Sequence, residues 1–328
     1  MAQGDRSMQR IGLADGATYP DMVHIAGGTF RMGSDKHYPE EAPVHRVTVG
    51  GFFIDRTPVT NRQFKEFVRA TGHVTVAEIV PDARDYPGAL PKMLYAGSLV
   101  FSPPNHPVDL RNWGQWWTFL RGANWRRPDG PKSNINVLDN HPVVHVAYAD
   151  ALAYARWAGK DLPTEAEWEF AARGGLEGAE FAWGDEFTPG GRYLANTWQG
   201  EFPHQNLCTD GFARTSPVSQ FPPNGYGLSD MIGNVWEWTS DFYAPKHEAD
   251  APKACCIPEN PRGAREQDSF DACQPNIRIP RKVLKGGSHL CAPNYCRRYR
   301  PAARHAEPVD TSTSHVGFRC VVRKSNSI

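Results

Sequence analysis

The stretch Asn224-Gly-Tyr-Gly-Leu-Ser-Asp-Met-Ile-Gly-Asn-Val-Trp-Glu-Trp238 combines glycines, two carboxylates and two tryptophans. Its glycines indicate tight turns rather than one long helix or strand. Asp230 and Glu237 bracket backbone carbonyls in this turn, and such a set of oxygens can hold a hard cation such as Ca²⁺. Asn196 and Asp210 lie in two further turns that could form a similar cage. Ordinary acidic turns are far commoner than calcium sites, so both interpretations stay open.

The whole chain has the same turn-rich composition. Of its 328 residues, 30 are Gly and 28 are Pro, which predicts many turns between short elements. Apolar residues make up 40% and charged residues 22%, enough for a globular core. The 36 Lys and Arg balance the 36 Asp and Glu, so the chain lacks the surplus positive charge of a general nucleic-acid-binding protein.

Several common classes of protein are excluded by missing patterns. Residues 1–20 contain no apolar run of the kind found in secretory signals, so we expect a cytoplasmic protein. No stretch reaches the roughly 18 consecutive apolar residues that a membrane span requires. Walker, strand-linked G-x-G-x-x-G, H-E-x-x-H and G-x-S-x-G patterns are also absent, which argues against the nucleotide-binding, zinc-protease and α/β-hydrolase classes.

The apolar spacing predicts short strands and a few capped helices. Short strands and turns are expected over 22–56, and an ordered but irregular segment over 74–142. Capping residues and apolar spacing predict three helices, at 60–72, 147–158 and 164–174. No linker divides the chain, so we expect one mixed domain, with boundaries as follows: an N-terminal extension (1–20), the domain (21–323) with a surface insertion (244–280), and a C-terminal tail (324–328).

A basic loop carries the candidate reactive thiols. In Lys285-Gly-Gly-Ser-His-Leu-Cys-Ala-Pro-Asn-Tyr-Cys-Arg-Arg-Tyr-Arg300, Cys291 and Cys296 lie five residues apart. Residues 281–304 hold seven Lys or Arg and no Asp or Glu, and positive charge favours the thiolate. Two thiolates on a short loop suit a soft, low-coordinate ion such as Cu(I), whereas zinc prefers four ligands. A labile disulfide or two ordinary thiols are the alternatives, although seven cysteines cannot all pair within one chain.

Histidines and tryptophans offer less specific signals. His289, His305 and His315 lie near the cysteines in sequence, so a Cys–His nucleophile pair is conceivable. Hydrogen-bonded structural histidines are the simpler interpretation. The tryptophans within 113–125 could form a substrate wall, and packing in the core is their ordinary use.

Taken together, these motifs resemble the formylglycine-generating enzyme (sulfatase-modifying factor) family. The matching stretches run in order along the chain: Gly27-Gly-Thr-Phe-Arg-Met-Gly33, Pro58-Val-Thr-Asn61, Ala158-Gly-Lys-Asp-Leu-Pro-Thr-Glu-Ala-Glu-Trp-Glu169, Asn196-Thr-Trp-Gln-Gly200, Gly233-Asn-Val-Trp-Glu-Trp238, Gly286-Gly-Ser288 and Gly317-Phe-Arg-Cys320. Most of them mark the fold superfamily, whereas the C-x4-C pair after Gly-Gly-Ser distinguishes the formylglycine-generating members.

The resemblance implies a fold and an activity. The fold would be α+β with little regular secondary structure, of the C-type-lectin-like kind. The activity would be a copper-dependent oxidase that uses O₂ and a thiol reductant to convert a cysteine in a Cys-x-Pro-x-Arg segment of a client sulfatase to Cα-formylglycine. We expect a monomer with no nucleic-acid or membrane partner.

The resemblance also assigns roles by position. Cys291 and Cys296 would hold Cu(I), with Ser288 and Tyr295 as further active-site residues and Trp236 and His315 in the substrate pocket. Structural Ca²⁺ would be held in two places, by Asn196, Thr197 (carbonyl), Asp210 and Phe212 (carbonyl), and by Asp230, Gly233 (carbonyl), Val235 (carbonyl) and Glu237.

Two positions depart from the family pattern. His315 stands where the family often has Asn, and Ala155 stands where some secreted relatives carry a cysteine, which leaves Cys320 without that partner.

Two alternatives to this activity stay open. An iron(II)-dependent sulfoxide synthase is one alternative, but such enzymes usually carry an N-terminal helical domain that residues 1–20 cannot hold. A non-catalytic lectin-like scaffold is the other. It would have no need of two thiols in a basic loop.

Overall fold

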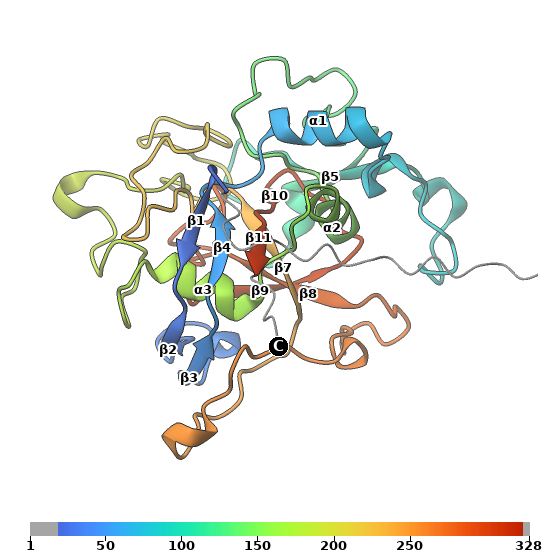
Figure 1. The fold of residues 1–328 in the computed structure, drawn as a ribbon. Coiled ribbons are helices and arrows are strands. Elements are labelled where there is room, and N and C mark those ends of the chain that lie inside the picture. Colours follow the sequence, from blue (N-terminus) through green and yellow to red (C-terminus); the bar gives the residue numbers. More distant parts are fainter. Residues whose placement is uncertain (1–18, 324–328) are drawn as a thin grey trace, which may run out of the picture.

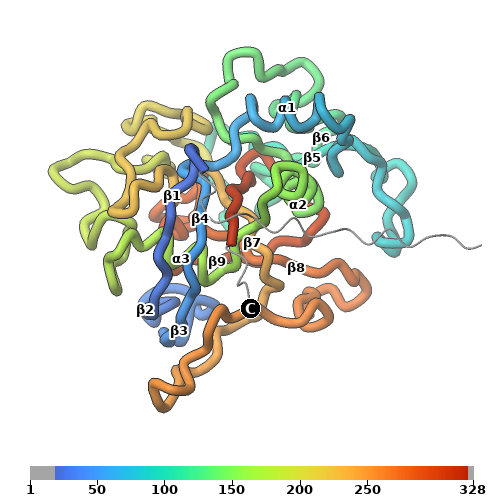
Figure 2. Tube along the Cα trace, viewed as in Figure 1, coloured from blue at the N-terminus to red at the C-terminus, as the bar shows by residue number. Residues whose placement is uncertain are grey.

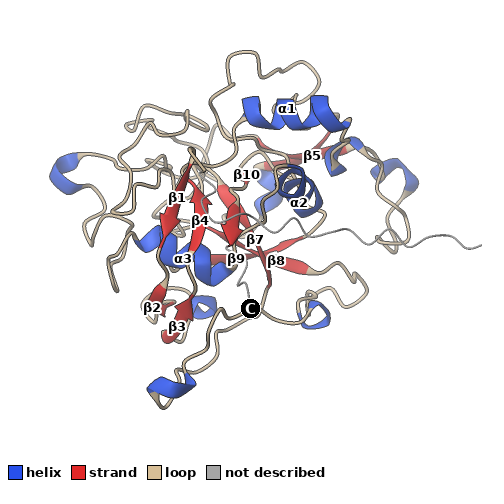
Figure 3. Cartoon of the chain, viewed as in Figure 1, coloured by secondary structure: helices blue, strands red, loops and turns tan. Residues whose placement is uncertain are grey.

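The computed structural model describes residues 19–323, so the tail 324–328 and nearly all of the extension 1–20 lie outside the described residues. Loops and turns make up most of the chain (Figure 3). The strands are β1 (Met22–Ile25), β2 (Gly28–Met32), β3 (His45–Val49), β4 (Phe52–Asp55), β5 (Gly97–Phe101), β6 (Trp117–Arg121), β7 (Trp236–Phe242), β8 (Arg281–Lys285), β9 (Arg304–Pro308), β10 (Val316–Gly317) and β11 (Val321–Arg323). The helices are α1 (Asn61–Thr71), α2 (Tyr148–Trp157) and α3 (Glu165–Arg173), with 3₁₀ turns at Pro39–Glu41, Val76–Glu78, Pro91–Met93, Trp113–Gln115, Pro189–Gly191, Ala254–Cys256 and Glu266–Asp268. Within residues 19–323, no helix has the length and apolar character needed to cross a membrane.

Two small sheets share the centre of the molecule. In the first, β4 lies between β1 and β11 and pairs antiparallel with both, so Ile54 faces Val23 on one side and Val321 on the other (Figures 1 and 2). The second has the order β10-β7-β8-β9, in which only the β10–β7 pair is parallel. Two-stranded pairs β2–β3 and β5–β6 complete the strands of the described chain. The period-two alternation of the sequence explains which side chains of these strands face the core. On β3, for example, Val47 and Val49 are buried, whereas Thr48 between them is only half-buried.

All three predicted helices are confirmed, and their caps explain where they begin and end. On α3, the Thr164 hydroxyl accepts the Glu167 N–H at 3.1 Å, and Gly174 ends the helix at φ 57°, a conformation that glycine adopts without strain. The helix packs against β2, β3, β7 and β8 and is buried on nearly all sides, with the Trp168 ring fully enclosed. It therefore forms the core around which the loops are arranged.

The structure corrects the irregular segment predicted at 74–142. Residues 97–101 and 117–121 pair as the antiparallel strands β5 and β6, with Phe101 opposite Trp117. The prediction was wrong because a 102–116 connection rich in proline and aromatics separates the strands, so no short hairpin turn announces them. This pair matters for function because both strands contribute residues to the main cavity.

Residues 244–280 form loops that project from the body of the molecule (orange in Figures 1 and 2). Their base is fixed to β3, where Thr48 donates its N–H to the Pro258 carbonyl at 2.9 Å. The three cysteines of this segment, Cys255, Cys256 and Cys273, are exposed thiols.

Candidate functional site

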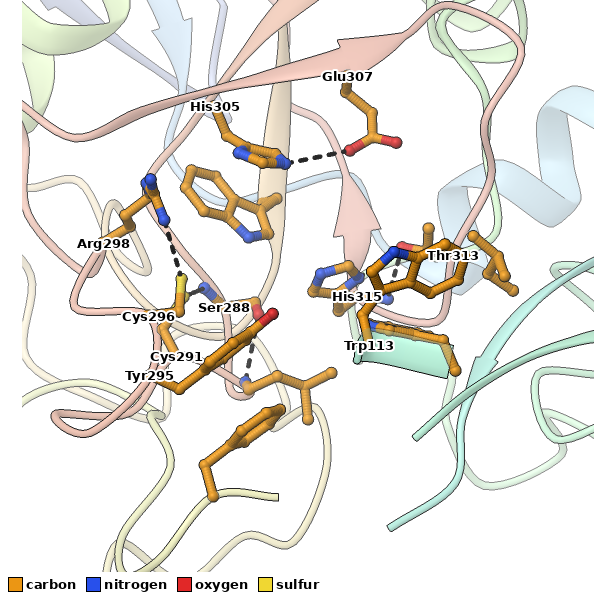
Figure 4. A pocket seen from close by; sticks show the side chains of 15 residues that line it. Trp113, Ser288, Cys291, Tyr295, Cys296, Arg298, His305, Glu307, Thr313 and His315 are labelled. Carbon is orange, nitrogen blue, oxygen red and sulfur yellow. Dashed lines mark hydrogen bonds and ion pairs between the residues drawn. The ribbon is translucent and has the colours of Figure 1, made fainter. Parts of the chain in front are cut away.

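One cavity of about 460 Å³ gathers every catalytic and substrate-binding residue that the sequence predicted (Figure 4). Its lining comes from five regions of the chain: Leu99, Trp113, Trp117, Phe202, Trp236, Ser288, Leu290, Cys291, Tyr295, Cys296, Arg298, His305, Glu307, Thr313 and His315. Residues far apart in sequence meet here because β10 pairs with β7 and places the 313–315 segment beside Trp236.

The two thiols lie together at one side of this cavity. Their sulfurs are 3.1 Å apart; Cys291 is fully buried, whereas Cys296 is partly open to the cavity. The Ser288 N–H points at the Cys291 sulfur from 3.4 Å. Gly287 makes this loop possible, because it has φ +70° and any Cβ there would lie 2.7 Å from the Arg298 carbonyl oxygen. The Gly-Gly-Ser motif thus lets the two halves of the cysteine loop close on each other.

The pKa values of the two thiols move in opposite directions. A hydrogen bond from Cys291, reinforced by the positive charge of Arg298, lowers the pKa of Cys296 to about 7. Burial is the main reason that the pKa of Cys291 is raised well above its ordinary value. The Arg298 guanidinium lies 4.0 Å from the Cys296 sulfur. Without a metal, the pair therefore carries at most one thiolate near neutral pH, at Cys296, rather than the two that the basic sequence suggested.

Most of the positive charge of residues 281–304 is neutralised by acids from other parts of the chain. The acids come from the 40–41 turn, α3 and Glu180, and the pairs are Arg298 with Glu40, Arg300 with Glu41, Arg304 with Glu165, Lys285 with Glu169, and Arg297 with Glu180. Sequence reasoning could not see these partners because they lie more than 100 residues away. Arg298 is the cation of this segment that also lines the cavity.

Aromatic rings form another wall of the cavity. Tyr295 stacks on Phe202 with ring centres 4.7 Å apart, and the edge of Trp116 meets Tyr295 at 5.4 Å. Trp113 lines the cavity and keeps 59% of its surface exposed, whereas Trp125 is buried in the core. The predicted substrate wall therefore draws on Trp113 and Trp117, and Trp125 has the packing role.

The remaining wall carries polar residues, several of which the sequence prediction missed. His315 lies against Trp117 at 4.9 Å, and burial lowers its pKa well below the ordinary value. His305 and Glu307 project from β9 into the cavity, and their side chains approach to 3.7 Å. Glu307 was not predicted from the sequence. It lies two residues after His305 on a short strand, so the two side chains share a face, and this spacing could have indicated it. His289 does not line the cavity; its ring instead hydrogen-bonds to the Asn234 carbonyl.

The first predicted calcium set comes together. Asn196 is buried, and its side-chain oxygen has no hydrogen-bond partner. The Asp210 carboxylate accepts the N–H groups of Thr197 at 3.0 Å and Phe212 at 2.9 Å. The Gln199 amide nitrogen donates both to that carboxylate and to the Thr197 carbonyl, so these two oxygens lie within reach of one group. An unpartnered buried oxygen beside a carboxylate and a carbonyl fits a hard cation.

The second predicted calcium set fits a cation less well. Asp230 is buried and accepts the Ser219 N–H at 2.8 Å, and burial raises its pKa to about 6. Both oxygens of the Glu237 carboxylate, however, accept from the Arg319 guanidinium at 2.7 and 2.8 Å, and one also accepts from Trp168. Glu237 is therefore the counterion of a buried arginine. The ligands left for a cation here are Asp230 and the carbonyls of this turn.

The thiol pair offers two soft donors at one point of the cavity. The sulfurs of Cys291 and Cys296 are 3.1 Å apart, and Cys296 is partly exposed. In the described part of the chain, no group of three or more His, Cys, Asp or Glu side chains is arranged as a metal cage. Two sulfurs without a third side-chain ligand suit a soft, low-coordinate ion such as Cu(I), which these two residues would hold.

Comparison with known proteins agrees with the geometry. The family described as the sulfatase-modifying factor enzyme 1-like domain matches residues 10–324. A formylglycine-generating enzyme of Mycobacterium tuberculosis is 56% identical over 302 residues, which cover 92% of this chain and 97% of the relative. That of Streptomyces coelicolor is 47% identical over 304 residues (91% and 88%). An inactive C-alpha-formylglycine-generating enzyme 2 of Bos taurus is 38% identical over 322 residues (94% and 89%).

Solved structures bear on the fold. PvdO of Pseudomonas aeruginosa is 24% identical, covers 92% of this chain and 94% of its own, and superposes with a TM-score of 0.60. The predicted fold class, α+β with little regular secondary structure, is thereby confirmed. The chain belongs to the sulfatase-modifying factor enzyme family, as its motifs predicted.

Proposed function

We propose that this protein oxidises a cysteine within a Cys-x-Pro-x-Arg segment of a client sulfatase to Cα-formylglycine, with Cu(I) held by Cys291 and Cys296 and with O₂ as the oxidant. The class of activity, generation of formylglycine by an enzyme, is that of its curated relatives. The observation that carries the proposal is the thiol pair, whose sulfurs are 3.1 Å apart and line a cavity of about 460 Å³. A scaffold would not need such a pair, which is why the non-catalytic alternative is disfavoured.

The overall reaction balances with one O₂ and one pair of thiols. The client CH₂–SH becomes an aldehyde and its sulfur leaves as sulfide. The client gives up two electrons and two hydrogens to become a thioaldehyde, two reductant thiols form a disulfide and supply two more, and O₂ takes all four to become two waters. One water then hydrolyses the thioaldehyde, which puts the oxygen in the aldehyde and releases H₂S. Bound Cu(I) would supply the O₂ activation that closed-shell organic groups lack.

The residues of the chain contribute positioning and charge. Cys296 offers a thiolate in the metal-free enzyme because Arg298 and the Cys291 thiol stabilise the negative sulfur. The Ser288 N–H fixes the Cys291 sulfur, and the Ser288 hydroxyl accepts the Leu290 N–H, which rigidifies the turn between them. Tyr295, held by Phe202 and Trp116, places a phenol beside the thiols. The aromatic wall would exclude water around a bound peptide.

The direct test is aldehyde formation on a peptide. The protein is incubated with a Cys-x-Pro-x-Arg peptide, Cu(I), a thiol reductant and air, and the aldehyde is measured by mass spectrometry after hydrazide capture. We expect turnover in the wild type and its loss in Cys291→Ser and Cys296→Ser, with Cys273→Ser as a matched control far from the cavity. Copper-loaded, folded protein that makes no aldehyde would sink the proposal for this motif.

Calcium and location complete the proposal. Asn196, Asp210 and the carbonyls beside them would hold a structural Ca²⁺, supported by the unpartnered Asn196 oxygen. The second site, around Asp230, is proposed with the carbonyls as its main ligands. We propose that the protein acts in the cytoplasm and as a monomer.

A further inference from the structure

The cavity has two chemically different sides. Cys291, Cys296 and Arg298 lie on one side, and Glu307 lies away from them, beyond His305 (Figure 4). Glu307 is the one carboxylate among the lining residues of this cavity in the described chain. Arg298 is the one guanidinium in the same lining. A bound peptide would therefore meet positive charge near the thiols and negative charge at a distance from them.

Glu307 lacks a cationic partner of its own. Its side chain is 14% exposed, and within residues 19–323 no Lys or Arg forms an ion pair with it. Lys282 is its cross-strand neighbour, but the lysine ammonium turns away, donates to the Ser240 carbonyl at 2.6 Å and lies over the Phe242 ring. His305 approaches only to 3.7 Å, and removal from bulk water, followed by the charge of Arg298, lowers the pKa of its imidazole.

The other neighbours of Glu307 do not offset its charge. The Thr311 side chain lowers the pKa of its carboxyl and the negative charge of Asp310 raises it, and neither brings a positive charge. Asp310 itself accepts a hydrogen bond from Tyr86. A carboxylate buried without a cation is costly, and burial accordingly raises the pKa of Glu307 to about 8. The group is therefore suited to bind a ligand that brings its own positive charge.

We propose that Glu307 is the specificity residue that binds the arginine of the client segment. The inference rests on the proposed function, which supplies the Cys-x-Pro-x-Arg client. Proline favours an extended polyproline conformation of about 3.1 Å per residue, which places the arginine Cα roughly 12 Å beyond the cysteine Cα. The anion that binds this arginine must thus lie away from the thiols, as Glu307, the one acid among the lining residues of the described chain, does (Figure 4). Arg298, beside the thiols, already has Glu40 as its partner, so among the described residues that side of the cavity offers no unpaired carboxylate to an arginine.

The test compares arginine with citrulline, which has nearly the same shape and no charge. Two peptides, Cys-x-Pro-x-Arg and Cys-x-Pro-x-citrulline, are assayed with the wild type, with Glu307→Gln and with Glu66→Gln, a matched change at an exposed position of α1. A charge-assisted pair predicts that the wild type and Glu66→Gln favour arginine by about 10- to 100-fold in kcat/KM. For Glu307→Gln we expect less than about 3-fold preference, expressed as a raised KM for the arginine peptide, because the citrulline peptide forms no ion pair that the substitution could remove.

A change in the ratio between the two peptides separates recognition from folding, because a merely destabilised enzyme would lose activity on both peptides in the same proportion. Glu307→Lys with a peptide carrying glutamate in place of arginine provides a reversed pair and should regain preference for its charged peptide. If Glu307→Gln keeps the wild-type preference for arginine, the inference is wrong.

A binding assay separates the failure of this inference from that of the proposed function. Peptides in which serine replaces the reacting cysteine are titrated by fluorescence anisotropy, so no turnover is needed. An arginine preference that disappears in Glu307→Gln supports the inference even for an enzyme that makes no aldehyde. An arginine preference that survives the substitution, or its absence in the wild type, overturns it.

Discussion

Arg319 anchors the turn before β7, the strand that begins at the cavity residue Trp236. Replacing Arg319 should therefore destabilise the protein severely. The side chain is fully buried, pairs with both oxygens of Glu237 at 2.7 and 2.8 Å, and donates to the carbonyls of Ser229 at 2.9 Å and Asp230 at 3.1 Å. Arg319→Met keeps most of the volume and leaves Glu237 buried without a cationic partner, with the Trp168 N–H as its remaining side-chain donor. Breaking a buried pair in this way costs about 3–5 kcal/mol. Because domains are stable by about 5–15 kcal/mol in total, the variant should lose about a fifth or more of its stability.

Urea denaturation followed by circular dichroism measures this loss. Arg111→Met is the matched control. Arg111 also forms an ion pair, with the Asp109 carboxylate at 2.8 Å, but its side chain is 91% exposed. Its denaturation midpoint should stay within error of the wild type. Adding Glu237→Leu to Arg319→Met should restore part of the stability, since the unpaired buried charge is gone. If Arg319→Met costs no more than the surface control, the pair does not anchor this turn and the reasoning fails.

Three further outcomes are expected. Cys255→Ser and Cys273→Ser should leave the rate of aldehyde formation nearly unchanged, because both thiols are exposed in the insertion; a large drop in either would show that the insertion reaches the site. Ca²⁺ at 100 times its Kd should stabilise the protein by about 2.7 kcal/mol, with the gain absent in Asn196→Ala; an equal Tm in chelator and in Ca²⁺ would contradict the first site. The preference for an arginine over a citrulline peptide in kcat/KM should rise as the pH passes upward through about 8, because Glu307 is protonated below its raised pKa and charged above it. His305 and Asp310 face the same carboxyl, so the control is Glu307→Gln, in which the ratio should be flat with pH.

Local features were readable from the sequence because they depend on neighbouring residues. The Thr164–Glu167 capping box and Gly174 placed α3, and the alternation of 44–49 placed β3. The cysteine pair was also a local signal, because its Gly-Gly-Ser turn and spacing lie within one loop. These predictions needed no knowledge of distant contacts.

The features that were missed depend on contacts between distant segments. The strands β5 and β6 are separated by a long loop, so their pairing shows only in the fold. Glu307 could not be recognised as a binding residue from the sequence. Only the fold of β9 places its carboxyl in the cysteine cavity, where no Lys or Arg of the described chain pairs with it. Of the two thiols predicted to be activated, only Cys296 has a lowered pKa, because burial depends on distant parts of the chain. Burial, which is a tertiary property, opposes ionisation at Cys291 while Arg298 promotes it at Cys296.

The first sheet joins early and late parts of the chain, since β4 lies between β1 at residues 22–25 and β11 at residues 321–323. Pairing across such a separation closes a very long loop, which slows folding. During synthesis the first sheet therefore stays incomplete until its C-terminal strand has been made. The cavity also forms late, because residues 288–315 contribute to its walls. Recovery of the close thiol pair after dilution from denaturant should thus track completion of the whole fold rather than an early collapse.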